Sequence, residues 1–443
     1  MTTTKNNEHK KLNFSSEREQ NQACLNSAEH EKNQGRKVLN VPNKREQNQT
    51  CLDSAEREGL RPKGNVPNLR FPEFQGEWEE HYLSDYLDFK NGLNPKPDKF
   101  GRGIKFISVM DILNNTVITN DCIRVSVDVS EEELHNFCVE NGDMLFQRSS
   151  ETLEDVGRAN VYMDDKPAVF GGFVIRGKKK AEYNPLFFRY LLASPFARRK
   201  IIPMGAGAQH FNIGQEGLNR VKLHFASLDE QKKIATFLSL LDERIATQNK
   251  IIEDLKKLKS AISKKLLCND KWTTYKIQDI AEIGRGRVIS SVEIDRQKHP
   301  LYPVYSSQTS NNGIMGYLDN YMFDGEYITW TTDGANAGTV FYRKGKFNCT
   351  NVCGTLKILP KFDCYFVSLV LQQATQKYVS SNLANPKLMN NTMASIKIRM
   401  PNIEAQKQLS KVFQTLDSCL LVHQRTCKMY LSEKQYLLRQ MFI

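Results

Sequence analysis

The chain has 443 residues, which is enough for two or three domains with cores of their own. A formal net charge of +12 and a pI near 9.1 favour an acidic partner, nucleic acid first and an anionic membrane surface second. No apolar run approaches the roughly 20 residues of a membrane helix, and the start lacks a signal-peptide core. We therefore expect a cytoplasmic protein with no membrane partner.

Residues 1–66 are polar and contain a tandem repeat. The run REQNQACLNSAEHE, from Arg18, returns as REQNQTCLDSAERE from Arg45. This segment offers too little apolar surface to offset the entropy of ordering it. We expect a disordered or weakly helical extension, and the simplest interpretation of the repeat is a duplication in the gene without a function.

Residues 67–226 are predicted to form a first folded domain, which is entered through a segment containing Trp78. Its pattern is mainly short strands, GIKFISV, DMLFQRSS, ANVYM and FGGFVIRG, followed by the helical run NPLFFRYLLAS. Strands followed by a late helix indicate a mixed α+β domain.

Residues 227–268 are predicted to form one long helix. Ser227 and Glu230 have the spacing of a capping box at its start. Apolar residues then recur at alternating steps of four and three, the period of a helix that pairs with another helix. This seam includes Ile234, Leu238, Leu241, Ile245, Ile252 and Leu255. At about 1.5 Å per residue the helix would be roughly 55 to 60 Å long, too long for one domain to cover.

Both elements occur a second time. Residues 269–400 repeat the order of strands and helix, and residues 401–443 repeat the long helix at a spacing of 175 residues, as from Leu241 to Leu416. The copied seam includes Leu409, Phe413, Leu416, Leu420, Tyr430 and Leu437. A single amphipathic helix would normally pack on its own domain.

The polar interruptions of the seam are copied as well. Gln248 corresponds to His423, and Lys259 corresponds to Lys434. Independent helices would not share such details, so the duplication in register favours pairing of the two long helices with each other.

The sequence offers little chemistry for catalysis. It has no Gly-rich loop closing on Lys-Ser or Lys-Thr, no strand-anchored Gly-x-Gly-x-x-Gly, and no Asn-Pro-Pro-aromatic motif for amino methylation. The ten cysteines are scattered. Cys349 and Cys353 come closest to metal-ligand spacing, but no histidine stands near them, so we expect buried thiols and no metal site.

Polar side chains suited to DNA gather where predicted strands run into loops. Arg suits guanine edges, Gln and Asn suit adenine, and Ser and Thr suit phosphate. In the first domain the candidates are Gln147, Arg148, Ser149, Ser150, Arg158, Gln209, His210 and Asn212. In the second they are Tyr305, Ser306, Ser307, Gln308, Asn311, Thr331, Thr332, Asn336, Asn385 and Lys387. Any one of them is more often an ordinary turn residue, but their equivalent placement in both domains favours DNA contact.

The duplicated organisation resembles the DNA-specificity subunit of type I restriction–modification enzymes over roughly residues 67–443. The most specific parts are LDEQKKIATFLSLLDERI and its copy IEAQKQLSKVFQTLDSCL. PNLRFPEF and the stretch from YSSQTSNNGIMGYL to TTDGANAGTVFYR are also typical of the family. The second copy departs from the pattern, with Ile403, Glu404 and Ala405 in place of Leu-Asp-Glu, and so does the amino-terminal extension.

The resemblance implies an α+β fold with two mixed target recognition domains. Each would be followed by a long helix, and the helices would pair as an antiparallel coiled coil with pseudo-twofold symmetry. Each domain would read one half of a bipartite, asymmetric site in double-stranded DNA, and the helices would set the gap between the halves.

The resemblance also implies a chain without catalytic activity and without a cofactor of its own. Its partners would be two modification subunits, which methylate adenine with S-adenosylmethionine, and restriction subunits driven by ATP with magnesium.

The residues alone leave two other classes open. One is a scaffold whose coiled coil is the functional part and whose domains bind proteins; it would lack the salt-dependent DNA affinity that phosphate contacts give. The other is a DNA-modifying enzyme, which the missing motifs disfavour. Binding of a metal or of S-adenosylmethionine by the purified chain would revive it.

Overall fold

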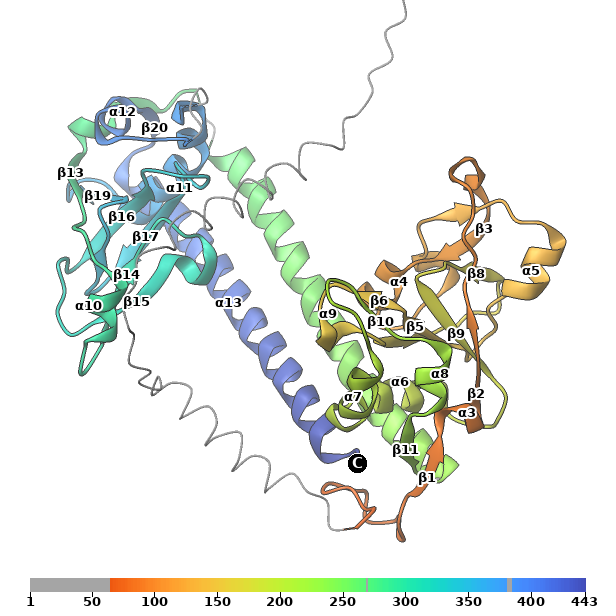
Figure 1. The fold of residues 1–443 in the computed structure, drawn as a ribbon. Helices are drawn as coiled ribbons and strands as arrows, with labels where there is room; N and C mark the ends of the chain where they lie inside the picture. The colour runs from red at the N-terminus through yellow and green to blue at the C-terminus, as the bar shows by residue number, and fades with distance from the viewer. Residues whose placement is uncertain (1–63, 268–269, 381–384) are drawn as a thin grey trace, which may run out of the picture. The chain divides into compact units, whose positions relative to one another are not determined.

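A computed structural model describes residues 64–267, 270–380 and 385–443 of the chain. The tandem repeat lies outside the described residues. The described residues belong to a compact unit, Pro62–Ile443, which contains both strand-rich regions and both long helices (Figure 1).

The first region is built from short strands with helices between them. Its strands are β1 (Glu79–Tyr82), β2 (Leu87–Asn91), β3 (Phe100–Ile107), β4 (Ser126–Val127), β5 (Met144–Gln147), β6 (Ser149–Ser150), β7 (Ala159–Val161), β8 (Ala168–Phe170), β9 (Val174–Lys179), β10 (Phe211–Asn212) and β11 (Lys222–Phe225). Its helices are α3 (Leu83–Tyr86), α4 (Val109–Asn114), α5 (Glu131–Phe137), α6 (Pro185–Ala193), α7 (Pro195–Ile201) and α8 (Gln215–Asn219).

The second region has the same character. Its strands are β12 (Thr273–Lys276), β13 (Ala281–Arg285), β14 (Tyr302–Tyr305), β15 (Ile314–Leu318), β16 (Glu326–Thr331), β17 (Val340–Lys344), β18 (Asn348–Cys349), β19 (Cys353–Ile358) and β20 (Lys397–Met400). Its helices are α10 (Ser291–Asp295), α11 (Cys364–Ala374) and α12 (Asn390–Ser395).

The sheets of the two regions share their strand order and strand directions. A four-stranded antiparallel sheet runs β2-β9-β5-β7 in the first region and β13-β19-β16-β17 in the second. A three-stranded sheet runs β4-β3-β8 and β15-β14-β18, and its last pair is parallel in both cases. A short pair, β1-β11 or β12-β20, joins the entry strand to the strand before the long helix. The predicted α+β class and its duplication are confirmed.

Two predicted strands are interrupted in the structure, since residues 143–150 form β5 and β6, and residues 170–177 are broken after β8. The run Phe170–Gly177 is predicted as continuous, but β8 ends at Phe170 and β9 starts four residues later. The backbone turns at Gly171 and Gly172 and packs closely on the chain after β2, where a Cβ atom on Gly92 would lie 2.1 Å from Gly171 O. Glycine at position 92 allows this close approach of two backbones, and the apolar residues on either side of the turn conceal it in the sequence.

The two long helices are α9 (Leu228–Leu266, 39 residues) and α13 (Ile403–Gln440, 38 residues). They lie alongside each other (Figure 1). The side chains of Ser227 and Asn402 cap them by accepting hydrogen bonds from the backbone N–H three residues on, at 3.5 and 3.0 Å. Neither helix, nor any other in the described part of the chain, is long and apolar enough to cross a membrane.

Two cores join the helices to the regions. The main core of the first region includes the first half of α9 and the carboxyl end of α13, down to Met441, Phe442 and Ile443. The core of the second region includes Phe413, in the first half of α13, and Leu267, just after α9. Each helix therefore starts on its own region and ends on the other.

Candidate nucleic-acid interface and its helical frame

Two reciprocal ion pairs join the long helices. Lys259 of α9 donates a hydrogen bond to Asp417 of α13, and Lys434 of α13 donates one to Asp242 of α9. The later residue on each helix meets the earlier residue on the other, so the helices run antiparallel about a pseudo-twofold axis. The predicted antiparallel pairing is confirmed.

The same aspartates tie each helix to its own region. The Tyr190 hydroxyl donates to Asp242 (2.8 Å), and the Tyr365 hydroxyl donates to Asp417 (2.5 Å). Arg189 adds an ion pair to Asp242 at 3.3 Å. Burial raises the pKa of both tyrosines, and the neighbouring carboxylate raises it further. Each carboxylate thus couples helix to helix and helix to region.

Polar residues interrupt the seam at the centre of the pair. His423 Nδ1 and Gln248 Oε1 lie 2.7 Å apart, and Cys427 Sγ donates to Asn249 Oδ1 at 3.3 Å. Because Gln248 and His423 are copies of each other, their contact places the pseudo-twofold axis beside them. A polar pair in an apolar seam specifies the register of the helices.

The apolar seam positions named from the sequence lie in the two cores, except Leu255. The buried ones are Ile234, Leu238, Leu241, Ile245, Ile252, Phe413 and Leu437. The half-buried ones are Leu255, Leu409, Leu416, Leu420 and Tyr430. Near the start of each helix the seam packs on the preceding region as well as on the other helix, so one stripe has two partners.

A glutamine near the start of each helix clamps the helix to the preceding region. Gln231 Oε1 accepts a hydrogen bond from the backbone N–H of Asn184, and Gln406 Oε1 accepts one from Asp363, both at 3.0 Å. Each amide nitrogen donates to a carbonyl just before its own helix, at 2.9 and 2.8 Å. Asn184 and Asp363 are the N-caps of α6 and α11. This shared geometry explains why both copies of the motif have Gln here.

The first long helix has an additional anchor. Glu230, 1% exposed, accepts hydrogen bonds from Arg70 (2.7 and 2.8 Å) and from Trp78 Nε1 (3.2 Å). The predicted capping box is therefore wrong in part, because Ser227 caps the helix but the Glu230 carboxylate turns to Arg70. The second copy has Ala405 at this position and lacks the anchor.

In the first region, most of the candidate contact residues lie on one edge. Ser149 of β6 pairs with Asn212 of β10, and Ser149 Oγ donates to Asn212 Oδ1. The backbone N–H of Gln147 donates to Arg158 O at 2.7 Å. We call this group the first reading edge: Gln147, Arg148, Ser149, Ser150, Arg158 and Asn212. Two further candidates, Gln209 and His210, lie in the exposed loop before β10.

Two side chains of the first reading edge face inward. Gln147 is 5% exposed, and its Nε2 donates to Ser149 O at 2.9 Å. Ser150 is also buried. These two side chains support the edge, whereas Arg148 is half-buried and Arg158 is exposed.

The second region forms a comparable edge at the end of β16. Leu388 N donates to Thr332 O at 2.9 Å, and Lys387 Nζ lies 3.8 Å from Asp333 Oδ1. These contacts bring two loops together. We call the group the second reading edge: Thr331, Thr332, Asn336, Asn385 and Lys387. Both threonines are buried, while the two asparagines are exposed.

The other candidates of the second region lie at a tight turn after β14. Tyr305 is the last residue of the strand, and Ser306, Ser307, Gln308 and Asn311 follow it in the turn. Asn311 and Asn312 both have left-handed backbone angles, with φ of 48° and 54°, and Gln308 Nε2 donates to Ile314 O at 2.5 Å. Two consecutive non-glycine residues of this kind are uncommon, and asparagine is among the residues that adopt this conformation most readily.

A buried arginine supports this turn from below. The Arg343 guanidinium lies 3.6 Å from the Tyr305 ring centroid and 4.4 Å from that of Phe341. Its Nε donates to Thr329 Oγ1 at 3.2 Å, and burial lowers the pKa of Arg343. Sequence analysis missed Arg343 because it comes from a strand far along the chain, with no local signal.

One backbone contact is the same in both regions. Arg148 N donates to Phe173 O at 2.9 Å, and Thr332 N donates to Val352 O at 3.0 Å. The turn between β8 and β9, like that between β18 and β19, therefore borders a reading edge. The glycine pair before Phe173 was the signal that could have identified this turn.

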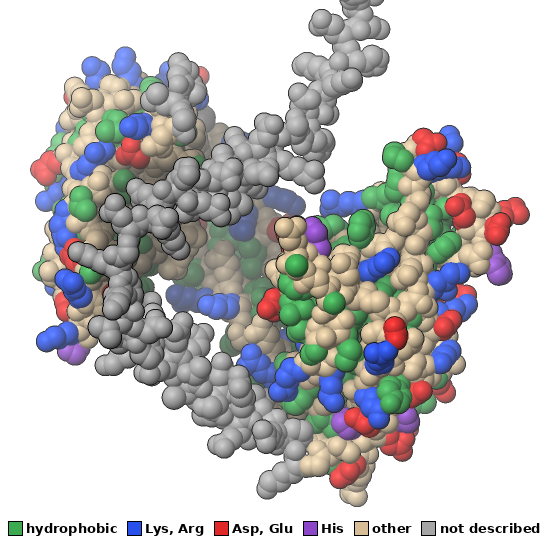
Figure 2. Space-filling model, in the orientation of Figure 1, with side chains coloured by type: hydrophobic (Ala, Val, Ile, Leu, Met, Phe, Trp, Pro, Cys, Tyr) green, Lys and Arg blue, Asp and Glu red, His purple; other side chains and the backbone are tan. Residues whose placement is uncertain are grey.

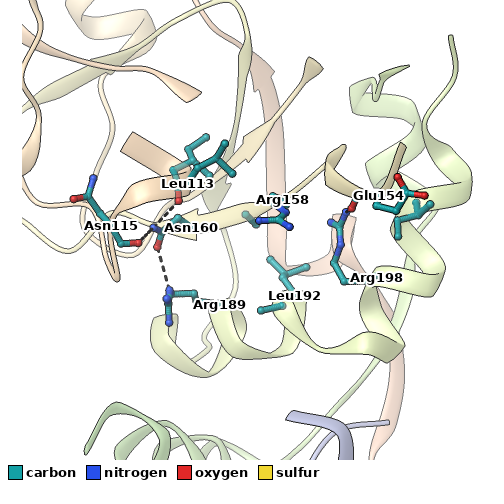
Figure 3. Close-up of a pocket in the computed structure, with 12 residues that line it drawn as sticks. Leu113, Asn115, Glu154, Arg158, Asn160, Arg189, Leu192 and Arg198 are labelled. Carbon is teal, nitrogen blue, oxygen red and sulfur yellow. Dashed lines mark hydrogen bonds between the residues drawn. The ribbon is translucent and has the colours of Figure 1, made fainter. Parts of the chain in front are cut away.

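A basic hollow of about 420 Å³ adjoins the first reading edge (Figure 3). Arg158, Arg189 and Arg198 line it together with Asn160. Arg198 Nη2 donates to Val156 O at 2.6 Å, whereas its buried Nη1 has no partner among the described residues. Burial lowers the pKa of Arg198 to about 10. Arg158 is paired with Asp155 at 2.6 Å, Arg189 is paired with Asp242 and Glu154 also lines the hollow, so much of its positive charge is already neutralised.

The chemistry available at the edges is hydrogen bonding and positive charge. No three His, Cys, Asp or Glu side chains of the described ranges converge as they would on a metal ion. Cys349 and Cys353 are free, buried thiols, and burial raises the pKa of Cys353 to about 11. Figure 2 shows lysine and arginine side chains on the visible face of both regions.

The two regions share one topology, each has a polar edge, and each is followed by one helix of the antiparallel pair. These features define a recognition protein with two binding regions. The family model of the type I restriction modification DNA specificity domain matches residues 75–257 and 269–428. The chain therefore belongs to this family. It is a DNA specificity subunit of the type I restriction–modification class, the non-catalytic part of such systems.

Several relatives come from Mycoplasma pneumoniae. The specificity subunit of the type I restriction enzyme MpnII is 42% identical over 145 residues, which cover 32% of this chain and 43% of that protein. A second protein, described provisionally as a type I specificity subunit, is 38% identical over 195 residues, covering 43% of this chain and 81% of the relative.

Solved structures share the fold. The S subunit of a type I restriction–modification system from M. genitalium superposes with a TM-score of 0.61 at 17% identity, covering 85% of this chain and 99% of that one. A chain from a study of complex assembly in a type I system gives 0.51 at 12% identity, covering 82% and 96%.

Proposed function

We propose that the chain recognises a bipartite, asymmetric site in double-stranded DNA. Residues 67–226 would read one half and residues 269–400 the other. The helices, residues 227–268 and 401–443, would hold the halves at a set spacing. One observation carries this proposal: the two regions have the same topology, but their equivalent edges have different side chains. Two different regions on a pseudo-twofold frame suit a DNA site with two different halves.

The proposed base and backbone contacts are the exposed and half-buried polar groups of the edges and the turn. In the first region they are Arg148, Ser149, Arg158, Gln209, His210 and Asn212, supported by Gln147 and Ser150. In the second they are Tyr305, Ser306, Ser307, Gln308, Asn311, Asn336, Asn385 and Lys387, supported by Thr331 and Thr332. Arginine and amide side chains would choose bases, and lysine and hydroxyl groups would contact phosphate.

The proposed partners are two modification subunits and the restriction subunits. S-adenosylmethionine would be bound by the former, and ATP with magnesium by the latter, so this chain would supply sequence choice alone. Two copies of a region followed by a helix offer two similar attachment sites, which suits two copies of one partner.

The test is co-expression with candidate modification subunits, followed by mapping of methylated adenines across the host genome. A single bipartite motif is expected. Replacing residues 269–400 by the same segment of another family member should change one half of that motif and leave the other half intact. A change in both halves, or DNA affinity that does not fall with added salt, would contradict the proposal.

A further inference from the structure

Large apolar side chains stand exposed beside the first reading edge. Phe173 is 67% exposed, Met110 is 61% exposed and Phe100 is 40% exposed. Together they line a mainly apolar hollow of about 440 Å³, and Ser149 also lines it. A single exposed apolar residue is ordinary, but several around one hollow mark a binding site.

Phe173 is held in a fixed position relative to Arg148. Arg148 N donates to Phe173 O at 2.9 Å, and Arg148 Nη1 donates to Gly172 O at 3.2 Å. The turn also packs closely on the chain after β2, since a Cβ atom on Gly92 would lie 2.1 Å from Gly171 O. The backbone of Phe173 is therefore held next to the guanidinium group of Arg148, and the exposed ring of Phe173 lies beside the first reading edge.

The chemical groups on the edges of DNA bases limit what could occupy the hollow. In the major groove, base pairs present hydrogen-bond donors and acceptors, and the 5-methyl group of thymine is the apolar group among them. A wedge between base steps would instead require a side chain that projects into the duplex. Phe173 and Met110 line a concave surface, which suits a group that enters the protein.

We propose that Phe173, with the hollow beside it, accepts the 5-methyl group of a thymine in the half-site read by the first region. This inference rests on the proposed function. The equivalent residue of the second region is Val352, which is smaller and half-buried. Methyl recognition of this kind is therefore assigned to one half-site only.

The experiment uses the full chain co-purified with its modification subunits and duplexes carrying the mapped site. Each thymine of the first half-site is replaced in turn by deoxyuridine, which removes only the methyl group. Fluorescence anisotropy at fixed salt should show binding about three- to fivefold weaker at one position, the effect of one methyl group leaving an apolar contact. In Phe173→Ala, binding to the thymine site should fall by a similar factor, and deoxyuridine should have no further effect.

The matched control is Leu301→Ala, which removes a similarly exposed side chain (71%) from the second region. It should keep the full effect of deoxyuridine. An absence of any effect in the wild type, or an effect that persists in Phe173→Ala, would overturn the inference. A 2-aminopurine unstacking signal that Phe173→Ala abolishes, without a methyl effect, would also overturn it and identify a wedge. If the wild-type complex does not distinguish its site from random duplex, the proposed function itself fails.

Discussion

Asp242 of α9 and Lys434 of α13 form a buried ion pair, whereas their copies, Asp417 and Lys259, form the same pair partly in solvent. The side chain of Asp242 is 9% exposed and that of Asp417 is 41% exposed. The frame therefore has pseudo-twofold geometry but unequal energetics. Burial also lowers the pKa of Lys434, because the charged ammonium is removed from water.

This inequality predicts different costs for equivalent substitutions. Asp242→Ala leaves the half-buried Lys434 and Arg189 without their carboxylate and should lower the free energy of unfolding by about 3 kcal/mol. Asp417→Ala should cost only about 1 kcal/mol, because its pair is screened by solvent. Urea unfolding of the full chain, followed by circular dichroism, measures both values. Equal costs would show that burial does not decide the strength of these pairs.

Because the thiol of Cys353 is buried, we expect the stability of the fold to fall at alkaline pH. Burial raises the pKa of its thiol from 9.0 to about 11. A thiol with a raised pKa stays protonated in the folded state at pH values where it ionises in the unfolded state. Its contribution to the free energy of unfolding is therefore complete below about pH 9 and is lost as the pH rises towards 11. In the wild type, the free energy of unfolding should fall between about pH 8 and pH 10.5. In Cys353→Ala this fall should be smaller by roughly 1 to 2 kcal/mol. Denaturant unfolding at both pH values checks this.

The control for this measurement is Cys419, which is an exposed free thiol on α13. Cys419→Ala should leave the pH dependence of the wild type unchanged. If Cys353→Ala shows the same loss as the wild type, the thiol is not protected from ionisation by burial.

We expect a substitution of Arg343 to relax base selectivity in the second half-site only. Arg343→Met keeps the apolar stem but loses the charge over Tyr305 and the bond to Thr329, at a cost of about 1 to 2 kcal/mol in stability. The turn after β14 should loosen, so methylation should tolerate changed bases in the second half-site while the first half-site stays strict. Methylation mapping measures both halves at once. Arg296→Met, at an exposed position of the same region, should change neither.

The sequence was sufficient for the frame because the frame repeats. A stripe that returns after 175 residues, with Lys259 and Lys434 at matching positions, specifies two helices that need each other. The sequence could not show that Lys259 pairs with Asp417 and Lys434 with Asp242, because an ion pair between distant segments leaves no local pattern. The sequence also could not show that the same seam packs both in the core of a region and against the other long helix.

The candidate interface was less predictable. Polarity and position before a loop identified Arg148 and Asn212, which the structure places on one edge. The same criteria also selected Gln147 and Thr332, whose side chains are buried, because polarity does not say which face of a strand a residue occupies. Phe173 escaped attention since an apolar residue in a strand-like run suggests core, and only the folded glycine turn exposes it.

The length of the frame should set the gap between half-sites. Seven residues inserted after Lys250 and seven inserted after Arg425 lie between the two ion pairs on both helices, so they preserve the ion pairs and the heptad period, although they separate Gln248 from His423. At about 1.5 Å per residue the frame would lengthen by roughly 10 Å, the rise of about three base pairs at 3.4 Å each. The methylated motif should keep both halves and gain about three unspecified bases. The same insertion in α9 alone shifts Lys259 away from Asp417 and should lower stability without a defined new gap. An unchanged gap in the double insertion would reject the helices as the spacer.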